Sequence, residues 1–339
     1  MREPNTWRLL VMTVLLAGAA ATGLALAGGE SDPTLASRDA VWRSIFARPS
    51  PLPPALNQAE DAAKVALGAQ LFVDARLSGD GSRSCASCHD PARGFTDGRA
   101  RALARDGSAL NRNVPSLYNL AWSAHYFADG RAASLEDQAR VPITAVNEMA
   151  GDFASITRKL NADARMAANF ARAFPATPEI NEATLVAALA AYERKLISPE
   201  TRFDRWVAGD DGALSDHERA GFSLFVGKAG CVGCHGGWRF TDDGFRDIGL
   251  PGDDPGRSAI VGGSPDLRQF KTPGLRELTR TAPYMHDGSL ATLRDVVDHY
   301  AGGFVKRPSL DSNLVRDLTL SEAEKLALIA FLRSLSSTQ

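Results

Sequence analysis

Two copies of one five-residue motif constrain this 339-residue chain more than any other feature. Cys85-Ala86-Ser87-Cys88-His89 and Cys231-Val232-Gly233-Cys234-His235 share the pattern Cys-x-x-Cys-His, and together they contain all four cysteines of the chain. In this pattern two thiols form thioether bonds to the vinyl groups of a haem, and the adjacent histidine binds the iron. The sequence therefore predicts two covalent c-type haems, held by Cys85, Cys88 and His89 and by Cys231, Cys234 and His235.

Other uses of the four cysteines fit the sequence less well. Two disulfides are the usual expectation for four cysteines in an oxidising compartment. A thioredoxin-like Cys-x-x-Cys pair belongs near a βαβ pattern in a reducing compartment, and no such pattern occurs here. A zinc site made from two Cys-x-x-Cys pairs needs them about 15–20 residues apart, whereas here more than a hundred residues separate the pairs.

The first 27 residues have the layout of a secretory signal peptide. Arg2 and Arg8 precede an apolar run that ends in Ala25-Leu26-Ala27, a small-x-small pattern that favours cleavage near Ala27. The alternative is an uncleaved anchor, because the run is close to membrane-spanning length. In both cases we expect the rest of the chain in a bacterial periplasm. No later apolar run is long enough to span a membrane, so we expect no membrane span after cleavage.

The surroundings of the motifs predict a mainly α fold made of two cytochrome c-like helical domains, each carrying one haem. Gly68-Ala69-Gln70-Leu71-Phe72 precedes the first motif and Gly221-Phe222-Ser223-Leu224-Phe225 the second, both on helical patterns. A capping box at Ser215-Asp216-His217-Glu218 opens the second of these helices, and another at Ser321-Glu322-Ala323-Glu324 opens the C-terminal helix. We expect a lead-in segment over 28–54 with extended Pro51-Leu52-Pro53-Pro54, a first domain over 55–200 and a second over 201–339.

Several further segments identify a family resemblance from about residue 55 to the C-terminus. They are Asn113-Val114-Pro115, Asp129-Gly130-Arg131-Ala132, Gln138, Pro142, Glu148 and Thr281-Ala282-Pro283-Tyr284-Met285-His286-Asp287-Gly288. With the two haem motifs, they make the chain resemble the di-haem cytochrome c peroxidase and MauG family. The resemblance implies that the N-terminal domain over 55–200 binds peroxide at its haem. It also implies that the second haem relays electrons or stores oxidising equivalents, and that a calcium ion lies between the haems.

The same resemblance assigns the residues around the first haem and the calcium ion. Glu148 is the expected acid/base group, because cleavage of the O–O bond needs a proton moved between the two oxygens. Gln138 is expected to position peroxide or water, and Pro142 to shape the distal wall. Alone, Glu148 is only a carboxylate at a helix edge, so its spacing from Gln138 and Pro142 carries the assignment. The implied calcium ligands are oxygens, which suit that ion: Asn113, with Thr281 and Pro283 through their backbone carbonyls.

The sixth position of the first iron is expected to be open. Peroxidases of this family usually close it with a histidine sixteen residues after the motif histidine, and here that position is Arg105. No histidine or methionine occurs between Asp90 and Arg112. An iron with an open position can bind peroxide. His125 is an alternative ligand, although we favour a structural role for it.

Tyr300 is the expected sixth ligand of the second iron, at the family position that holds methionine in the usual peroxidases. A helical face supports it, because four residues recur at i, i+3, i+4 and i+7: Leu293, Val296, Val297 and Tyr300. On the same helix His299 faces the side that bears Asp295. The alternative is that Tyr300 only packs in the core while Met285 or His299 binds iron. His286 is expected to support a haem propionate or a loop.

One departure from the family pattern lies between the haems. The family usually has tryptophan directly before the Asp-Gly-Arg stretch, and here that residue is Ala128. Either the haems couple differently or another aromatic residue substitutes. The candidates are Trp122, Tyr126 and Trp238, each of which is also an ordinary core residue.

These features favour a periplasmic MauG-like enzyme with a tyrosine-ligated second haem, similar to the MauG-like enzymes associated with methanobactin. It is expected to use hydrogen peroxide to form a high-valent di-haem state that oxidises Trp or Tyr side chains of a partner protein. The alternative is a di-haem cytochrome c peroxidase that scavenges hydrogen peroxide with electrons from a small electron-donor protein. A non-enzymatic electron carrier is disfavoured by the residues around Glu148. A net charge of −2 excludes nucleic-acid binding through bulk positive charge.

Overall fold

A computed structural model describes residues 33–50, 62–263, 267–314 and 318–338. The expected signal peptide and the Pro51-Leu52-Pro53-Pro54 stretch lie outside the described residues. Within the described ranges, no helix combines the length and the apolar character that a membrane span requires.

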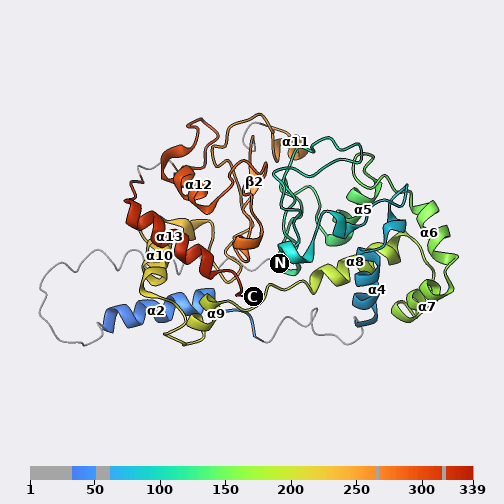
Figure 1. Ribbon diagram of the computed structural model, residues 1–339, viewed down its shortest axis with the longest axis horizontal. Coiled ribbons are helices and arrows are strands. Elements are labelled where there is room, and N and C mark those ends of the chain that lie inside the picture. The colour runs from blue at the N-terminus through green and yellow to red at the C-terminus, as the bar shows by residue number, and fades with distance from the viewer. Residues whose placement is uncertain (1–32, 51–61, 264–266, 315–317, 339) are drawn as a thin grey trace, which may run out of the picture.

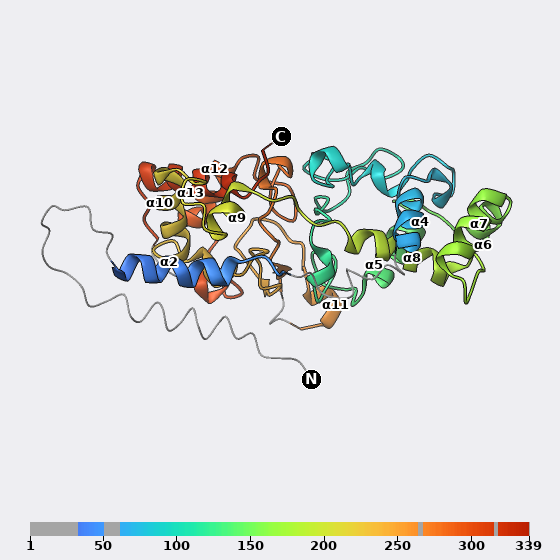
Figure 2. The ribbon, with the colours of Figure 1, turned by 90° about the horizontal axis from the view of Figure 1, so that it is seen from below.

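The helices form two groups that lie side by side in two perpendicular views (Figure 1, Figure 2). We call residues 62–197 the N-terminal lobe, and residues 33–46 with 201–338 the C-terminal lobe. The first contains α4 (Ala62–Phe72), α5 (Leu135–Thr144), α6 (Phe153–Asn161), α7 (Ala164–Ala173) and α8 (Glu182–Arg194). The second contains α2 (Pro33–Phe46), α9 (Arg202–Val207), α10 (Asp216–Val226), α11 (Ser258–Val261), α12 (Leu293–Asp298) and α13 (Glu322–Ser334).

Regular β structure is limited in the described residues to two short strands. β1 (Phe245–Arg246) and β2 (Phe270–Lys271) pair antiparallel, with Phe245 opposite Lys271. Loops with 3₁₀ turns make up most of the remainder between the two helical groups. The predicted mainly α fold is confirmed.

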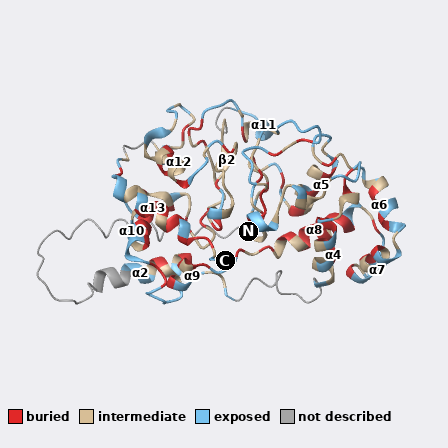
Figure 3. Cartoon of the chain, viewed as in Figure 1, coloured by how far each residue is buried: buried red, intermediate tan, exposed pale blue. Residues whose placement is uncertain are grey.

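Each lobe has its own hydrophobic core, visible as buried residues along the facing helices in Figure 3. In the N-terminal lobe, α4 packs on α8 through Leu67, Leu71 and Leu189. In the C-terminal lobe, α10 packs on α13, and aromatic rings fill the core: Phe46, Phe203, Phe222, Phe225, Phe240 and Phe331. The boundary near residue 200 stays a prediction, although the two cores lie on either side of it.

Helix α2 was not anticipated by the sequence, which predicted only a lead-in segment over 28–54. Its Trp42 and Phe46 are buried in the C-terminal core, and Phe46 lies 4.8 Å from Phe240 between ring centroids. Arg48 then donates to the carbonyl of Ser198 at 2.9 Å, close to the connection between the lobes. The start of the described chain therefore packs on the second lobe rather than on the first.

The two lobes repeat one helix-packing arrangement. A Cβ added to Gly68 on α4 would lie 2.0 Å from the carbonyl oxygen of Ala188 on α8. A Cβ added to Gly221 on α10 would lie 2.0 Å from the carbonyl oxygen of Ala327 on α13. Each glycine of the repeated segment therefore permits the backbones of two helices to touch.

A second repeat links the loops that follow the motifs. The chain from Pro115 to Pro142 matches the chain from Pro273 to Tyr300 at a constant offset without gaps. The isolated bridge between Tyr126 and Ala132 recurs between Tyr284 and Leu290. Corresponding residues also start the next helices: Ser134 accepts from Asp137 N before α5, and Thr292 from Asp295 N before α12. Helices α5 and α12 are therefore structural counterparts.

The predicted helix ends agree with the structure. Ser215 and Glu218 form the capping box of α10, and Ser321 and Glu324 that of α13. A π-helical turn, His299–Gly303, continues α12 and ends where Gly302 adopts a φ of 121°. This is a left-handed backbone that glycine adopts without strain.

The close contact between α4 and α8 gives a test of the fold. Gly68→Ala should lower the free energy of unfolding by about 1–3 kcal/mol, because the new methyl group forces two backbones apart. Gly212→Ala is the matched control, since the nearest atom to its new Cβ lies 3.4 Å away. Urea unfolding followed by circular dichroism measures both. Equal stability of the two variants would show that the helices can separate at no cost.

Candidate haem sites and the contact between them

Both Cys-x-x-Cys-His motifs fold as a single 3₁₀ turn, Cys85–Ser87 in the first lobe and Cys231–Gly233 in the second. In each, the backbone N–H of the motif histidine donates to the carbonyl of the first cysteine at 2.9 Å. No disulfide joins any two of the four cysteines, so the disulfide alternative is wrong.

One hydrogen bond orients each motif histidine. Nδ1 of His89 lies 2.9 Å from the carbonyl oxygen of Phe95, and Nδ1 of His235 lies 2.8 Å from that of Phe240. A ring nitrogen that faces a carbonyl oxygen carries the proton, so Nε2 keeps its lone pair for a metal. Burial lowers the pKa of both rings, which favours the neutral form that a metal ligand requires.

The acceptors of these bonds were missed by the sequence analysis. Phe95 and Phe240 have φ angles of 62° and 57°, a left-handed conformation that is rare for phenylalanine. Both precede Thr-Asp after a motif, as Phe95-Thr96-Asp97 and Phe240-Thr241-Asp242. This repeated tripeptide was the signal that could have identified them.

The predicted peroxide-site residues lie on α5 and the loop after it. Gln138 and Pro142 are four residues apart and therefore share one face of the helix. The backbone N–H of Met149 donates to the carbonyl of Pro142 at 3.2 Å, and that of Glu148 to Ala145 at 3.0 Å. The loop thus folds back onto the end of α5, which brings Glu148 to Pro142.

Glu148 lies close to the first motif and is partly buried. Burial raises the pKa of its carboxyl, and the nearby Arg131 partly offsets this. Glu148 in turn contributes to the raised pKa of the Cys88 thiol, which indicates that the two groups are near each other. Arg131 is held by Asp129 at 2.8 Å within the Asp129-Gly130-Arg131 turn.

Arg105 lies beside the same loop but its side chain points elsewhere. Its backbone N–H donates to the carbonyl of Asn147 at 3.0 Å, next to Glu148. Its guanidinium pairs with Asp80. The pKa of the Asp80 carboxyl is lowered first by its hydrogen bond with Ser82 and then by the one with Arg105. His125 packs against Phe245 of β1, with ring centroids 5.6 Å apart. The open sixth position of the first haem stays a prediction.

Tyr300 lies against the second motif. Burial raises the pKa of its phenol, and the thiols of Cys234 and Cys231 add to the rise, so the three groups lie close together. Nε2 of His299 lies 2.8 Å from the carbonyl oxygen of Ile248, so this ring nitrogen makes a hydrogen bond to the backbone. In the repeat of the two lobes, Pro142 occupies the position that corresponds to Tyr300. Ligation by Tyr300 stays a prediction.

The predicted calcium ligands come from two loops in contact. The backbone N–H of Asn113 donates to the carbonyl of His286 at 2.8 Å, and its Nδ2 donates to that of Arg99 at 2.8 Å. This leaves the side-chain oxygen of Asn113 available to a cation. Thr281 and Pro283 lie on the loop that carries His286, so an oxygen-only donor set fits this place. The described residues contain no cluster of three His, Cys, Asp or Glu side chains that could hold a metal.

His286 supports this loop by stacking. Its ring lies 3.6 Å from that of Phe270 between centroids, with an angle of 11° between the planes. Desolvation lowers the pKa of His286, and Asp287 and Asp254 oppose the shift. A neutral ring is the form that stacks on Phe270 without the cost of a buried charge.

Two tryptophans join the lobes near the position where the usual tryptophan is absent. Trp122 and Trp238 meet edge to face, with centroids 4.7 Å apart and planes at 82°. Arg239 donates to the hydroxyl of Ser123 at 3.1 Å beside them. The carbonyl of Ala128 accepts from the backbone of Lys271 at 2.7 Å, so that residue lies against β2. The Trp122–Trp238 pair therefore spans the lobe contact.

Tyr126, the third aromatic candidate, is engaged in its own lobe. Its side chain is buried, and its hydroxyl lies 3.2 Å from the carbonyl of Ser123. Tyr284 occupies the corresponding place in the second lobe and donates to the carbonyl of Leu278 at 3.0 Å. This recurrence favours a structural role for Tyr126.

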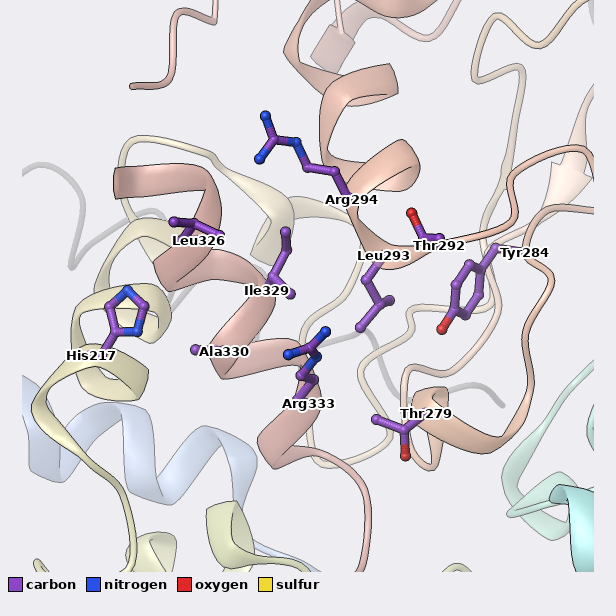
Figure 4. Close-up of a pocket in the computed structure, with 10 residues that line it drawn as sticks. All are labelled: His217, Thr279, Tyr284, Thr292, Leu293, Arg294, Leu326, Ile329, Ala330 and Arg333. Atoms are coloured by element: carbon purple, nitrogen blue, oxygen red, sulfur yellow. The ribbon is translucent and has the colours of Figure 1, made fainter. Parts of the chain in front are cut away.

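A groove of about 670 Å³ lies on the C-terminal lobe, between α12, α13 and the loop at Tyr284 (Figure 4). Leu293 and Ile329 form apolar parts of its wall, and Arg294 and Arg333 add charge. None of the predicted site residues lines it. It is therefore separate from the predicted peroxide site.

Comparisons with known proteins agree on one family. A model of the family described as di-haem cytochrome c peroxidase matches residues 62–212. The methylamine utilization protein MauG of Methylorubrum extorquens is 44% identical over 301 residues, which cover 88% of this chain and 85% of that protein. The cytochrome-c peroxidase IdrP1 of Denitromonas iodatirespirans is 38% identical over 329 residues, covering 85% and 86%.

A solved structure shares the fold over most of the chain. The crystal structure of a MauG-like protein associated with microbial copper homeostasis superimposes with a TM-score of 0.76 at 32% identity. The match covers 86% of this chain and 96% of that protein. The likeness therefore extends over both lobes.

Proposed function

The chain belongs to the di-haem cytochrome c peroxidase family, and from this premise we propose that it is a periplasmic MauG-like enzyme. Membership means an oxidoreductase that uses peroxide and carries two c-type haems. The proposed reaction is the oxidation of a Trp or Tyr side chain of a partner protein. The relatives include both MauG proteins and cytochrome c peroxidases, so the proposal depends on residues of this chain.

The observation that carries the proposal is the different residue at one repeated position. Proline stands at position 142 in the peroxide-binding lobe and tyrosine at position 300 in the other. Proline has no side-chain atom that can bind iron, whereas the phenol of Tyr300 can do so. The two haems, when bound, supply an open iron for peroxide on one side and a fully ligated centre on the other.

The residues of the first lobe handle the protons of peroxide. Glu148 would accept the proton of the inner oxygen and return it to the outer oxygen, which can leave as water when the bound haems supply the two electrons that break the O–O bond. Gln138 orients the peroxide by hydrogen bonding, and the ring of Pro142 keeps water out of the distal side. Because Arg105 is paired with Asp80, no side chain from that position competes for the iron.

Tyr300 sets the character of the second site. A phenolate oxygen donates charge and favours oxidised states, whereas the methionine of the usual peroxidases favours the reduced state. Such a centre is suited to share the oxidising equivalents of peroxide with the first haem. This division of labour supports oxidation of a partner protein over steady consumption of donor electrons.

We further propose a calcium ion between the lobes, bound by the side-chain oxygen of Asn113 and the carbonyls of Thr281 and Pro283. The contact of these loops across the lobes supports the proposal. The ion would fix the distance between the two haem sites.

Hydrogen peroxide added to the diferric holoprotein tests the function. We expect the absorption spectrum to change without prior reduction and the change to persist, because no donor electrons are stored. Strict dependence on pre-reduction, together with rapid oxidation of a reduced cytochrome c, would instead establish a scavenging peroxidase; the IdrP1 relatives are named cytochrome-c peroxidases.

The ligand of the second haem is tested by paired substitutions. Tyr300→Phe removes the phenol oxygen and should change the absorption and electron paramagnetic resonance spectra of the second haem. His299→Leu should leave those spectra unchanged. It should nevertheless lower the free energy of unfolding by about 1–3 kcal/mol, because it leaves the carbonyl of Ile248 unpaired. Unchanged spectra in Tyr300→Phe would refute the assignment.

Glu148→Gln should slow the reaction with hydrogen peroxide by about 10²–10⁴-fold, because the amide cannot accept a proton. Only the carboxylate form of Glu148 accepts that proton. Since burial raises its pKa, the wild-type rate should fall as the pH drops through that raised pKa, and level off above it. The variant should lose this pH dependence, as stopped-flow absorption would measure. Asn147→Ala, at an exposed neighbouring position, should keep both the rate and its pH profile.

A further inference from the structure

Glu193 is a buried carboxyl group that the proposed mechanism does not use. It lies in the last turn of α8, with 5% of its surface exposed. Its Oε2 is enclosed and has no hydrogen-bond partner. No other carboxylate oxygen of the described residues is both enclosed and without a partner. Other buried carboxylates are paired, such as Asp204 with Arg276 and Glu277 with Arg280. An unpaired buried carboxyl is more stable neutral than charged.

The groups around Glu193 do not compensate its charge. Arg194, the next residue on α8, pairs with Glu136 of α5 at 2.7 Å. Arg194 lowers the pKa of Glu193 and Glu136 raises it, so they oppose each other. Burial dominates and raises the pKa of Glu193 to about 8. The remaining titratable groups that face it are Tyr126, Tyr192 and Cys85.

The electrostatic interaction with Cys85 places Glu193 near the first haem site. Burial, followed by the charge of Glu193, raises the pKa of the Cys85 thiol to about 12. Cys85 supplies a thioether bond rather than an iron ligand, so Glu193 lies beside the attachment point of the first haem. A charge there interacts with the haem through a medium of low dielectric constant.

The second lobe shows what the fold needs at this place. The backbone N–H of Asn119 donates to Leu196 at 2.7 Å, and that of Glu277 donates to Leu335 at 3.0 Å. These contacts align the ends of α8 and α13 and make Leu332 the counterpart of Glu193. Leu332 is 8% exposed and belongs to the apolar core. An apolar leucine is therefore sufficient for packing at this position. Packing does not explain why the first lobe has a carboxyl group there.

We propose that Glu193 is a proton-binding site coupled to the first haem. When that haem gains one electron from a one-electron donor protein, the carboxylate of Glu193 binds one proton from solvent and becomes a carboxylic acid. Oxidation of the haem releases the electron and the proton again. The proposal rests on the first covalent haem, which the family supplies, and not on oxidation of a partner protein.

The sign of the coupling follows from the charges. A ferric haem carries one more positive charge than a ferrous haem, so it lowers the pKa of Glu193 from about 8. Between the ferric and ferrous pKa values, reduction takes up a proton, so the midpoint potential falls as the pH rises. Above both values Glu193 is charged in both states, and the potential is constant. At a fixed potential, the ferric-to-ferrous ratio changes by up to tenfold per pH unit. This corresponds to a shift of the midpoint potential of about 59 mV per pH unit.

Spectroelectrochemical titration of the holoprotein at several pH values tests the proposal. The first haem should show a falling midpoint potential on the acid side of pH 8 and a plateau above it. Glu193→Gln should abolish the slope at the first haem. Glu193→Leu, which copies the second lobe, should do the same and serves where the amide variant fails to fold. Infrared difference spectra should show a carboxylic acid band that appears on reduction of the wild type only.

Glu182→Gln is the matched control, because it removes an exposed carboxyl from the first turn of the same helix. It should retain the wild-type slope. A slope that survives in Glu193→Gln, or a wild-type potential independent of pH, would overturn the proposal. The reaction of the diferric protein with peroxide tests the proposed function separately, so the failure of one is distinguishable from the failure of the other.

Discussion

The hydrogen bond from each motif histidine to a phenylalanine carbonyl is the constraint on which both haem sites depend. A histidine attached one residue after a covalent anchor has little freedom of position, but its ring can still rotate. The bonds to Phe95 and Phe240 remove that rotation and select the tautomer that leaves Nε2 available. Both carbonyls are aimed by left-handed backbones, whose strain the surrounding fold must hold.

Duplication explains how one chain makes two such sites and still treats them differently. The glycine contacts, the loop bridges and the helix caps recur in both lobes, so the scaffold around each iron is the same. The lobes differ by substitutions at equivalent positions. Tyr300 has an oxygen that can bind iron, whereas its counterpart Pro142 has none. Glu193 has an ionisable carboxyl group, whereas its counterpart Leu332 is apolar.

Much of this was predictable because it depends on local patterns. The motifs, the helices around Leu71 and Phe225, and the capping boxes at Ser215 and Ser321 involve residues within one or two turns of each other. The family resemblance assigned roles to Glu148, Gln138 and Tyr300, and these roles stay predictions. Helix α2 was missed because its apolar residues contact the C-terminal core, far away in sequence. Glu193 was missed because a glutamate near a helix end is normally exposed.

The repeated scaffold also clarifies the altered position between the haems. The indole that the family usually places before Asp129 is replaced by Ala128, whose backbone pairs with β2. The edge-to-face pair of Trp122 and Trp238 holds the same lobe contact, but Arg48 and Arg276 lie within 6 Å of the Trp238 ring. Cations at that distance stabilise the neutral ring and oppose the removal of an electron from it. The pair is therefore better suited to fix the lobes than to carry a positive charge between them.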